Sequence, residues 1–401
     1  MKQICLSVAL VFGLISMACA DQSQVFSKEP IFPPQEKHTH SSSIIALPNG
    51  DLLACWFYGS GERHANDVIV QGARLVNGSK TWSKPFEMAD TPNVPDCNPV
   101  LFENNGTIWL YWIAVENNEW HDAILHYEKA NVNDINPNGS PKWNTQGIIT
   151  MVPGDIFYDT TVAGFDWLKE NKGYDPIWAD YAPPYYKLVE EAAKDPVKRQ
   201  KGWQTRIHPI VLQHSKKGRI LLPLYSDGFN MSLVAISDDN GKSWMASKPI
   251  VGLGPIQPSI VEKNDGTLVA YCRDSGSGHH VQISTSTDSG ETWSAAVYSD
   301  IPNPGSSLEV IKLNNGDWLM VSNDLKDGRY RLTAALSENQ GSTWDYKRTI
   351  AYAPEETGNS YSYPSVLQTS DGMIHLTYSC VENGKETIEY AYFNTDWLMN
   401  K

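Results

Sequence analysis

Ser286-Thr287-Asp288-Ser289-Gly290-Glu291-Thr292-Trp293 is the stretch that decides the fold of this chain. Nearly the same pattern begins at Ser237 and at Ser337, so the pattern recurs about every 50 residues. In each copy an Asp or Asn can hydrogen-bond its own turn, a Gly supplies a positive φ, and the closing Trp can cover the end of a hairpin. Weaker copies lie at 77–82 and 138–143. The pattern predicts a repeated structural turn, not a catalytic site.

A second repeat alternates with the first and consists of a turn followed by an apolar strand. Its turns end in six glycines: Gly50, Gly106, Gly218, Gly266, Gly316 and Gly372. The segments after them are rich in β-branched and aromatic residues, as strands are. Small antiparallel sheets repeated at this period are typical of β-propellers. The six turns therefore predict an all-β fold, a six-bladed β-propeller.

The interval between Gly106 and Gly218 is too long for one blade. We predict one propeller domain over residues 21–401, with an insertion at about 151–205 between the second and third blades. Its stretch Pro183–Lys201 has the spacing of an amphipathic helix. Insertions of this size in a compact fold are usually functional or interaction elements, so we expect it to overhang the pocket.

The composition excludes some classes of partner. The 401 residues include 14 Trp, 19 Tyr, 29 Gly and 24 Pro, and 19% are charged, which is typical of a globular protein with many turns and a large core. The formal net charge of −14 argues against nucleic acid or an anionic membrane as a partner. A few arginines in one cleft can still reverse the local field and bind an acidic substrate.

The N-terminus has the pattern of an export signal. Lys2 is followed by an apolar run from Ile4 to Met17 and by a small-residue cleavage site, Ala18-Cys19-Ala20. We predict cleavage after Ala20 and a secreted or periplasmic protein. A lipid anchor at Cys19 is the alternative, but Ser16 stands where such a site prefers Leu. No later segment is apolar enough to predict membrane insertion.

Four cysteines remain in the predicted mature chain, and none has the spacing of a metal site. We predict that they are buried free thiols, not disulfides. The four are Cys55, Cys97, Cys272 and Cys380.

The Ser-x-Asp-x-Gly-x-Thr-Trp pattern resembles the Asp-box (BNR) repeats of the sialidase superfamily, and the resemblance covers nearly all of the predicted mature chain. It implies a sialidase-like six-bladed propeller. Sialidases hold the substrate carboxylate with three arginines, because a guanidinium grips a planar anion through two hydrogen bonds. A Tyr activated by a Glu is their nucleophile, and a loop Asp is the acid.

Two of the three arginines have counterparts in this sequence. His40 stands where the first arginine is expected, eight residues before the first turn. Arg273 matches the second, in Gly266-Thr-Leu-Val-Ala-Tyr-Cys-Arg273, and Arg329 matches the third, with Arg331 as a neighbour. Because a His titrates where a general acid or base must, we assign His40 a catalytic role.

The nucleophile and its base are matched less completely. Tyr361, in Tyr361-Ser362-Tyr363-Pro364, corresponds to the nucleophile by motif, and we assign Tyr363 to substrate binding. Gln257 stands where the activating Glu is expected. A Gln cannot accept the phenolic proton as a carboxylate would, and an unactivated Tyr is a poor nucleophile at neutral pH.

Further candidates lie on loops and strand ends. The loop 59–67 contains two candidate acids, Glu62 and Asp67, and Arg63 as a substrate contact; solvated loop charge is the alternative. Asn98 is a candidate substrate contact at the start of the second blade. Arg206 or His208, at the start of the third, could supply the positive charge lost with the first arginine.

These residues predict an exo-acting glycoside hydrolase that removes a terminal, acidic sugar from a glycan. Two alternatives stay open: a polysaccharide lyase on a uronate-containing glycan, with His and Tyr as base and acid, and a carbohydrate-binding propeller without catalysis. His38 and His40 form a His-x-His pair with no third ligand in the sequence, so we predict no metal, and no cofactor motif is visible. The oligomeric state does not follow from the sequence.

Overall fold

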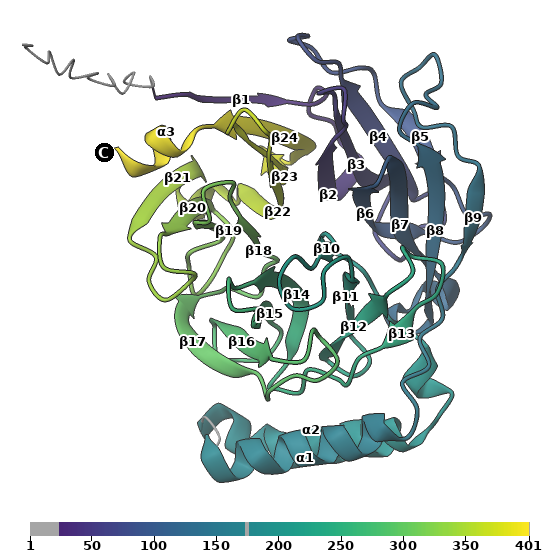
Figure 1. Cartoon of the computed structure of the whole chain (residues 1–401), viewed down its shortest axis with the longest axis vertical. Coiled ribbons are helices and arrows are strands. Elements are labelled where there is room, and N and C mark those ends of the chain that lie inside the picture. Colours follow the sequence, from purple (N-terminus) through teal and green to yellow (C-terminus); the bar gives the residue numbers. More distant parts are fainter. Residues whose placement is uncertain (1–23, 173–175, 401) are drawn as a thin grey trace, which may run out of the picture.

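The structure, a computed structural model, describes residues 24–172 and 176–400. Within these residues, six four-stranded antiparallel sheets stand around a central axis as the blades of a propeller (Figure 1). The chain passes round the ring in order, from blade one to blade six. In each blade the first strand lies nearest the axis, and most neighbouring blades meet through these inner strands. The predicted fold class is confirmed.

The blades are built from consecutive strands. Blade one contains β2 (His38–Ala46), β3 (Leu52–Gly59), β4 (Ile69–Leu75) and β5 (Phe86–Ala89), and blade two contains β6 (Asp96–Asn104), β7 (Thr107–Val115), β8 (Ala123–Asn131) and β9 (Thr145–Ile148). Blade three contains β10 (Ile210–Val211), β11 (Ile220–Ser226), β12 (Met231–Ser237) and β13 (Met245–Ala246), and blade four contains β14 (Pro255–Glu262), β15 (Leu268–Asp274), β16 (His280–Ser286) and β17 (Val297–Pro302). Blade five contains β18 (Glu309–Lys312), β19 (Trp318–Ser322), β20 (Arg331–Ser337) and β21 (Tyr346–Tyr352), and blade six contains β22 (Ser360–Gln368), β23 (Ile374–Glu382), β24 (Lys385–Phe393) and β1 (Phe26–Pro30).

The antiparallel order gives the ring two different faces. The turns between first and second strands and between third and fourth strands lie on one face, which we call the turn face. The loops between second and third strands and the connections between blades lie on the other, the loop face. The six turn glycines of the sequence repeat all have φ between 78° and 94°, a region in which only glycine is unstrained.

The Asp-box repeats form hairpin ends on the turn face. In blade four the Oδ1 of Asp288 accepts a hydrogen bond from the Thr292 N–H at 2.9 Å, and Oδ2 accepts one from the Thr292 hydroxyl. Asp239 and Asn339 bind the equivalent residues of blades three and five. These side chains replace hydrogen bonds that the turning backbone cannot make, so their role is structural.

The N-terminal strand closes the ring. It pairs with β24 from Phe26↔Phe393 to Pro30↔Glu389, so the outermost strand of the last blade comes from the start of the chain. A strand borrowed from the opposite end of the chain joins the first and last blades without an exposed gap.

A second device joins the inner strands around the axis. At four of the six junctions a side-chain oxygen of one inner strand accepts a hydrogen bond from a backbone N–H of the next. These contacts, which we call the inner ring, are Ser43 to Leu101 N (3.0 Å), Ser259 to Val310 N (2.8 Å), Glu309 to Val366 N (2.8 Å) and Ser365 to Ile44 N (3.1 Å). All are buried, and the last one joins blade six to blade one.

The insertion between β9 and β10 forms a pair of helices, α1 (Ile156–Asn171) and α2 (Pro176–Lys194). Phe157 of α1 packs against Phe229, and the Tyr185 hydroxyl of α2 donates to the Phe229 carbonyl. Gly164 lies so close to Val251 that a Cβ would sit 2.7 Å from it. The helices therefore lie outside the ring beside blades three and four, and the expectation that they overhang the pocket was wrong (Figure 1).

Helix α1 was not predicted from the sequence, and α2 begins and ends earlier than predicted. The buried α1 residues Phe157, Thr161, Phe165 and Leu168 have helical spacing, which was the available signal. Helix α2 ends at Lys194 rather than Lys201, because Pro196 disfavours helical conformation at Asp195, the residue before it.

Two other predictions concern the cysteines and the N-terminus. The four cysteines of the predicted mature chain are free and buried, as expected. The predicted export signal at residues 1–20, with its alternative lipid site, lies outside the described residues. Over 24–172 and 176–400, none of the helices is both long enough and apolar enough to cross a membrane.

The inner ring makes a prediction about stability. Ser365→Ala leaves the buried Ile44 N–H without its acceptor, so the free energy of unfolding should fall by about 1–3 kcal/mol. Ser79→Ala removes an exposed serine from a turn and is the matched control, with an expected change within about 0.5 kcal/mol. Denaturant unfolding measures both. Equal, small effects in the two variants would contradict a stabilising role for the ring.

Candidate active site at the loop face

A repeated irregularity in the inner strands aims side chains at the axis. In blades one, two, four and six the pairing of first and second strands shifts register near the loop face. One residue at each shift takes a left-handed backbone: Ser41 (φ 60°), Asn98 (φ 49°), Gln257 (φ 52°) and Tyr363 (φ 55°). Such a bulge re-aims a side chain, and left-handed backbone at a non-glycine residue is strained. Strain repeated at equivalent places points to a functional site.

Tyr363 is the centre of a cationic cluster. Arg273 Nη1 donates to its hydroxyl at 2.8 Å. The guanidinium carbons of Arg206 and Arg329 lie 5.0 and 5.3 Å from the centre of its ring. The ring of His40 lies 4.1 Å away, centre to centre. Four blades and the return of the insertion therefore bring three arginines, one histidine and one tyrosine together.

The three arginines are not equivalent. Arg206 is only 2% exposed and donates to the Ser42 and Pro364 carbonyls at 3.2 and 3.0 Å, so it is a buried charge that holds the inner strands of blades one and six. Arg273 and Arg329 are partly exposed. These two can reach a bound anion, and a guanidinium can grip a carboxylate through two hydrogen bonds.

The arginines also change the acidity of Tyr363. Burial alone would raise the pKa of Tyr363, but the charges of Arg273 and Arg329 and a hydrogen bond with Gln257 outweigh it and bring the pKa below its ordinary value. Tyr363 therefore ionises to the phenolate more easily than an ordinary tyrosine does. Because the thermodynamic cost of ionising the phenol falls, Tyr363 can act as a nucleophile or a base.

His40 is held neutral within the cluster. Burial and the nearby charges of Arg329, His38, Arg206 and Arg273 keep the pKa of His40 well below its usual range. Its neighbour on the strand, His38, lies 3.1 Å from a carboxylate oxygen of Glu386. Burial works against protonation of His38, but Glu386 and Glu62 more than offset it and raise the pKa of His38. At neutral pH the two histidines therefore differ in their tendency to carry a proton.

Uncharged side chains connect the cluster to a carboxyl on the opposite side of the axis. Gln257 hydrogen-bonds with the hydroxyls of Tyr363 and Tyr225. Asn98 Nδ2 donates to Tyr225 Oη at 3.1 Å and to Gln204 Oε1 at 3.3 Å. Gln204 Nε2 in turn donates to Asp227 at 2.9 Å.

Two loops form a wall beside the site. The backbone oxygen of Asn118, in the loop between β7 and β8, accepts a hydrogen bond from Arg63 Nε at 3.1 Å, and Asn118 Nδ2 donates to Asn66. The Arg63 guanidinium also lies 5.5 Å from the Trp120 ring. Glu62, on the same loop as Arg63, interacts electrostatically with both Tyr363 and His38.

The structure places Tyr361, the nucleophile by motif, outside the cluster. Its hydroxyl donates to Glu382 at 2.7 Å, and the ring packs in the apolar layer with Tyr378. Burial and Glu382 raise the pKa of Tyr361 above its ordinary value. The geometry therefore does not support Tyr361 as the nucleophile, because the bulge after it turns Tyr363, not Tyr361, toward the axis.

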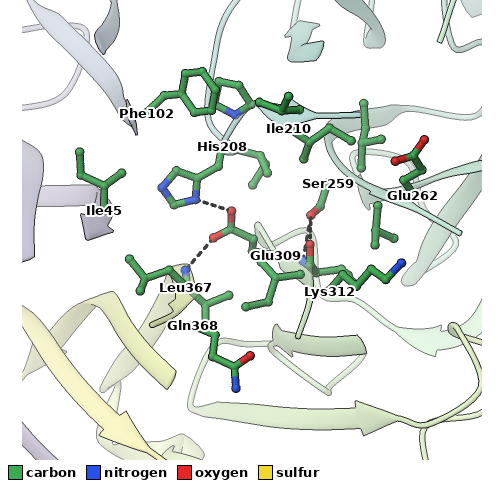
Figure 2. A pocket seen from close by; sticks show the side chains of 18 of the residues that line it. Ile45, Phe102, His208, Ile210, Ser259, Glu262, Glu309, Lys312, Leu367 and Gln368 are labelled. Atoms are coloured by element: carbon green, nitrogen blue, oxygen red, sulfur yellow. Dashed lines mark hydrogen bonds and ion pairs between the residues drawn. The ribbon is translucent and has the colours of Figure 1, made fainter. Parts of the chain in front are cut away.

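His208 lies deeper in the channel and does not touch the cluster. Its Nδ1 lies 2.7 Å from Glu309 and its Nε2 lies 3.0 Å from the Ser43 hydroxyl, so it contacts two side chains of the inner ring. The channel around it is a cavity of about 440 Å³, lined by the later halves of the inner strands toward the turn face (Figure 2). Of the two residues proposed to replace the first arginine, Arg206 supplies charge near Tyr363 and His208 does not.

Asp67, one of the two candidate acids of the loop 59–67, also lies outside the cluster. Asp67 accepts two hydrogen bonds from Ser60 and pairs with Lys37 at 3.1 Å, and these contacts lower its pKa to about 2. A carboxyl this acidic is a poor proton donor at neutral pH, so the assignment of Asp67 as acid is not supported.

Three residues of the site were not predicted from the sequence: Tyr225, Gln204 and Asp227. Tyr225 stands seven residues after Gly218 in the second strand of blade three, as Arg273 stands seven after Gly266 in blade four, and Asp227 follows directly after that strand. Comparison of second-strand ends between blades was the available signal. Among the described residues, no group of three or more His, Cys, Asp or Glu is arranged to hold a metal ion.

Comparisons with known proteins agree with this architecture. The chain is 26% identical to a sialidase of Micromonospora viridifaciens over 383 residues, 89% of this chain and 51% of that protein. It is 30% identical to an anhydrosialidase of Macrobdella decora over 179 residues, 40% of this chain and 23% of that protein. The chain thus spans about half of the first relative's length and about a quarter of the second's.

A solved structure of a Dyadobacter fermentans protein of unknown function has the same fold. Its TM-score is 0.64 at 16% identity, covering 92% of this chain and 97% of that chain. The sequence itself matches the BNR repeat-like domain family over residues 50–145 and 194–376, and the interruption coincides with the helical insertion. The chain therefore belongs to the BNR repeat-like domain family.

Proposed function

We propose that this protein is an exported glycoside hydrolase of the sialidase superfamily that removes a terminal, carboxylate-bearing sugar from a glycan. The observation that carries the proposal is the convergence of Arg206, Arg273 and Arg329 on Tyr363. The names of the two relatives, a sialidase and an anhydrosialidase, support the same class of chemistry. Export rests on the signal pattern at residues 1–20.

Binding of the substrate follows from the charges. Arg273 and Arg329 are the partly exposed cations of the cluster, so they would hold the sugar carboxylate. The wall formed by loops 59–67 and 116–122 borders the site on one side, which supports binding of a chain end rather than the middle of a polymer. Trp120 on this wall offers an apolar ring beside a cation.

Hydrolysis would proceed in two displacements. Tyr363 Oη bonds to the anomeric carbon while the bond from that carbon to the leaving oxygen breaks, and the leaving oxygen takes a proton. Water then attacks the same carbon, and the Tyr363–carbon bond breaks. The base of an ordinary sialidase is replaced by Gln257, so the phenolate depends on the arginine charges. Neutral His40 adds a polar ring without opposing these charges.

A polysaccharide lyase is the second candidate, favoured by the neutral His40 ring packed directly on Tyr363. In β-elimination the arginines would neutralise a uronate carboxylate while a base removes the adjacent proton and an acid protonates the leaving oxygen. A lyase leaves an unsaturated sugar with ultraviolet absorbance, and a hydrolase does not.

The function is tested with aryl glycosides of carboxylated sugars and of their neutral analogues. We expect turnover of the carboxylated set only, without ultraviolet-absorbing sugar products. Tyr363→Phe should lower kcat by about 1,000-fold or more, because it removes the attacking oxygen. Tyr361→Phe is the matched control and should stay within a few-fold of the wild type, since its hydroxyl binds Glu382. The reverse ranking of the two variants would sink the assignment, and binding without turnover would favour a non-catalytic propeller.

The lowered pKa of Tyr363 gives an independent prediction in the absence of substrate. A positive charge stabilises the phenolate more than the phenol, so one tyrosine should ionise below the ordinary value of about 10. Ultraviolet pH titration should show this phase in the wild type and in Tyr361→Phe but not in Tyr363→Phe. Arg273→Met should move it to higher pH. Superimposable curves for wild type and Tyr363→Phe below pH 10 would contradict the electrostatic account.

A further inference from the structure

Asp227 is a carboxyl in the site that no motif identifies. It follows β11 in the loop to β12, on the loop face and exposed to solvent. Its Oδ2 accepts the 2.9 Å hydrogen bond from Gln204, whose side chain is completely buried. An accessible carboxyl is therefore held by a rigid, buried support, as a group that acts on a bound substrate must be.

The support of Asp227 leads back to the centre of the site. Gln204 is held by Asn98, Asn98 also binds Tyr225, and Gln257 hydrogen-bonds with both Tyr225 and Tyr363. The network joins residues of blades two, three, four and six. Its members between Asp227 and Tyr363 are all uncharged at neutral pH, so none of them forms an ion pair that would lock the carboxyl in its ionised state.

Resting on the proposed function, we propose that Asp227 is the general acid and base of the reaction. In the first step the leaving oxygen takes the proton of Asp227 as Tyr363 bonds to the anomeric carbon. In the second step the ionised Asp227 takes a proton from the attacking water as the bond to Tyr363 breaks. The proton is returned, so the cycle consumes only water and glycoside.

The surroundings of Asp227 fit this role. It is open to solvent and yet has protein on most sides, as a residue in a cleft does; the surrounding protein raises the pKa of Asp227, and Gln204, Arg273 and Arg63 only partly offset the rise. Tyr225 is the remaining titratable neighbour, and the pKa of Tyr225 is itself raised well above its ordinary value, chiefly by burial. Asp67, by contrast, is held ionised by Ser60 and Lys37.

The test compares two glycosides of one carboxylated sugar. One has a nitrophenol leaving group, which departs without a proton, and the other has a sugar leaving group, which needs one. Asp227→Asn keeps an oxygen for the Gln204 hydrogen bond. It should lower kcat/KM on the sugar aglycone by about 100- to 10,000-fold, and lower the glycosylation rate on the nitrophenyl glycoside by less than about 10-fold. The high-pH limb of the wild-type profile on the sugar aglycone should disappear.

The control is Asp327→Asn, an exposed carboxyl on the same face, with no expected change on either substrate. If Asp227→Asn lowered the rates on both substrates equally, or lowered neither, Asp227 would not be the general acid and base. The proposed hydrolase function would still stand. A wild type that turns over neither glycoside would overturn the proposed function as well. Retained binding of the sugar by Asp227→Asn, measured calorimetrically, separates loss of proton transfer from loss of folding.

Discussion

The inner ring of hydrogen bonds is the constraint on which the site depends. A propeller blade contacts its neighbours mainly through its inner strand, so the position of any axial side chain depends on how those strands are joined. Ser43, Ser259, Glu309 and Ser365 each bind the backbone of the next blade. Val100 stands at the corresponding place in blade two and has no side-chain acceptor, and the strand register puts His208 there in blade three. There Arg206 and His208 reach across the axis instead and bind blades one, five and six.

The strained residues of the site lie two positions before the ring. Ser41, Gln257 and Tyr363 precede Ser43, Ser259 and Ser365, respectively, with one residue between. A left-handed backbone at a non-glycine residue costs on the order of 1–3 kcal/mol. Because the ring holds the strand directly after each bulge, the strained residue cannot relax by sliding along its partner. The hydrogen bonds between blades thus help to hold the strained backbone that points Gln257 and Tyr363 at each other.

The contrast between the well-predicted fold and the partly predicted site has a physical reason. Turn glycines and Asp-boxes act within a few residues, so their chemistry is visible in a single stretch of sequence. Tyr361 and Tyr363 are separated by two positions and would share a face in a regular strand. The bulge breaks this period, so motif matching pointed to Tyr361 whereas the structure turns Tyr363 toward the axis. An X-Pro step shared by Asn98, Gln257 and Tyr363 marks the bulged position in three blades and was the signal to use. Gln204 and Asp227 meet Asn98 only after blades two and three pack together, and no local pattern reports that.

Replacement of a base by Gln257 changes how the tyrosine is activated. A carboxylate beside Tyr363 would accept its proton but would also cancel part of the arginine charge. With Gln257 the charge stays uncompensated, and the phenolate is stabilised by the field of three guanidinium groups. A substrate carboxylate bound to Arg273 and Arg329 neutralises part of this field at the moment when the nucleophile is needed. Arg206 is buried beneath Tyr363 and bonded to two backbone carbonyls, so a bound substrate does not reach it. The charge of Arg206 therefore still stabilises the Tyr363 phenolate when the substrate is bound. Direct contact with the substrate carboxylate would neutralise this charge.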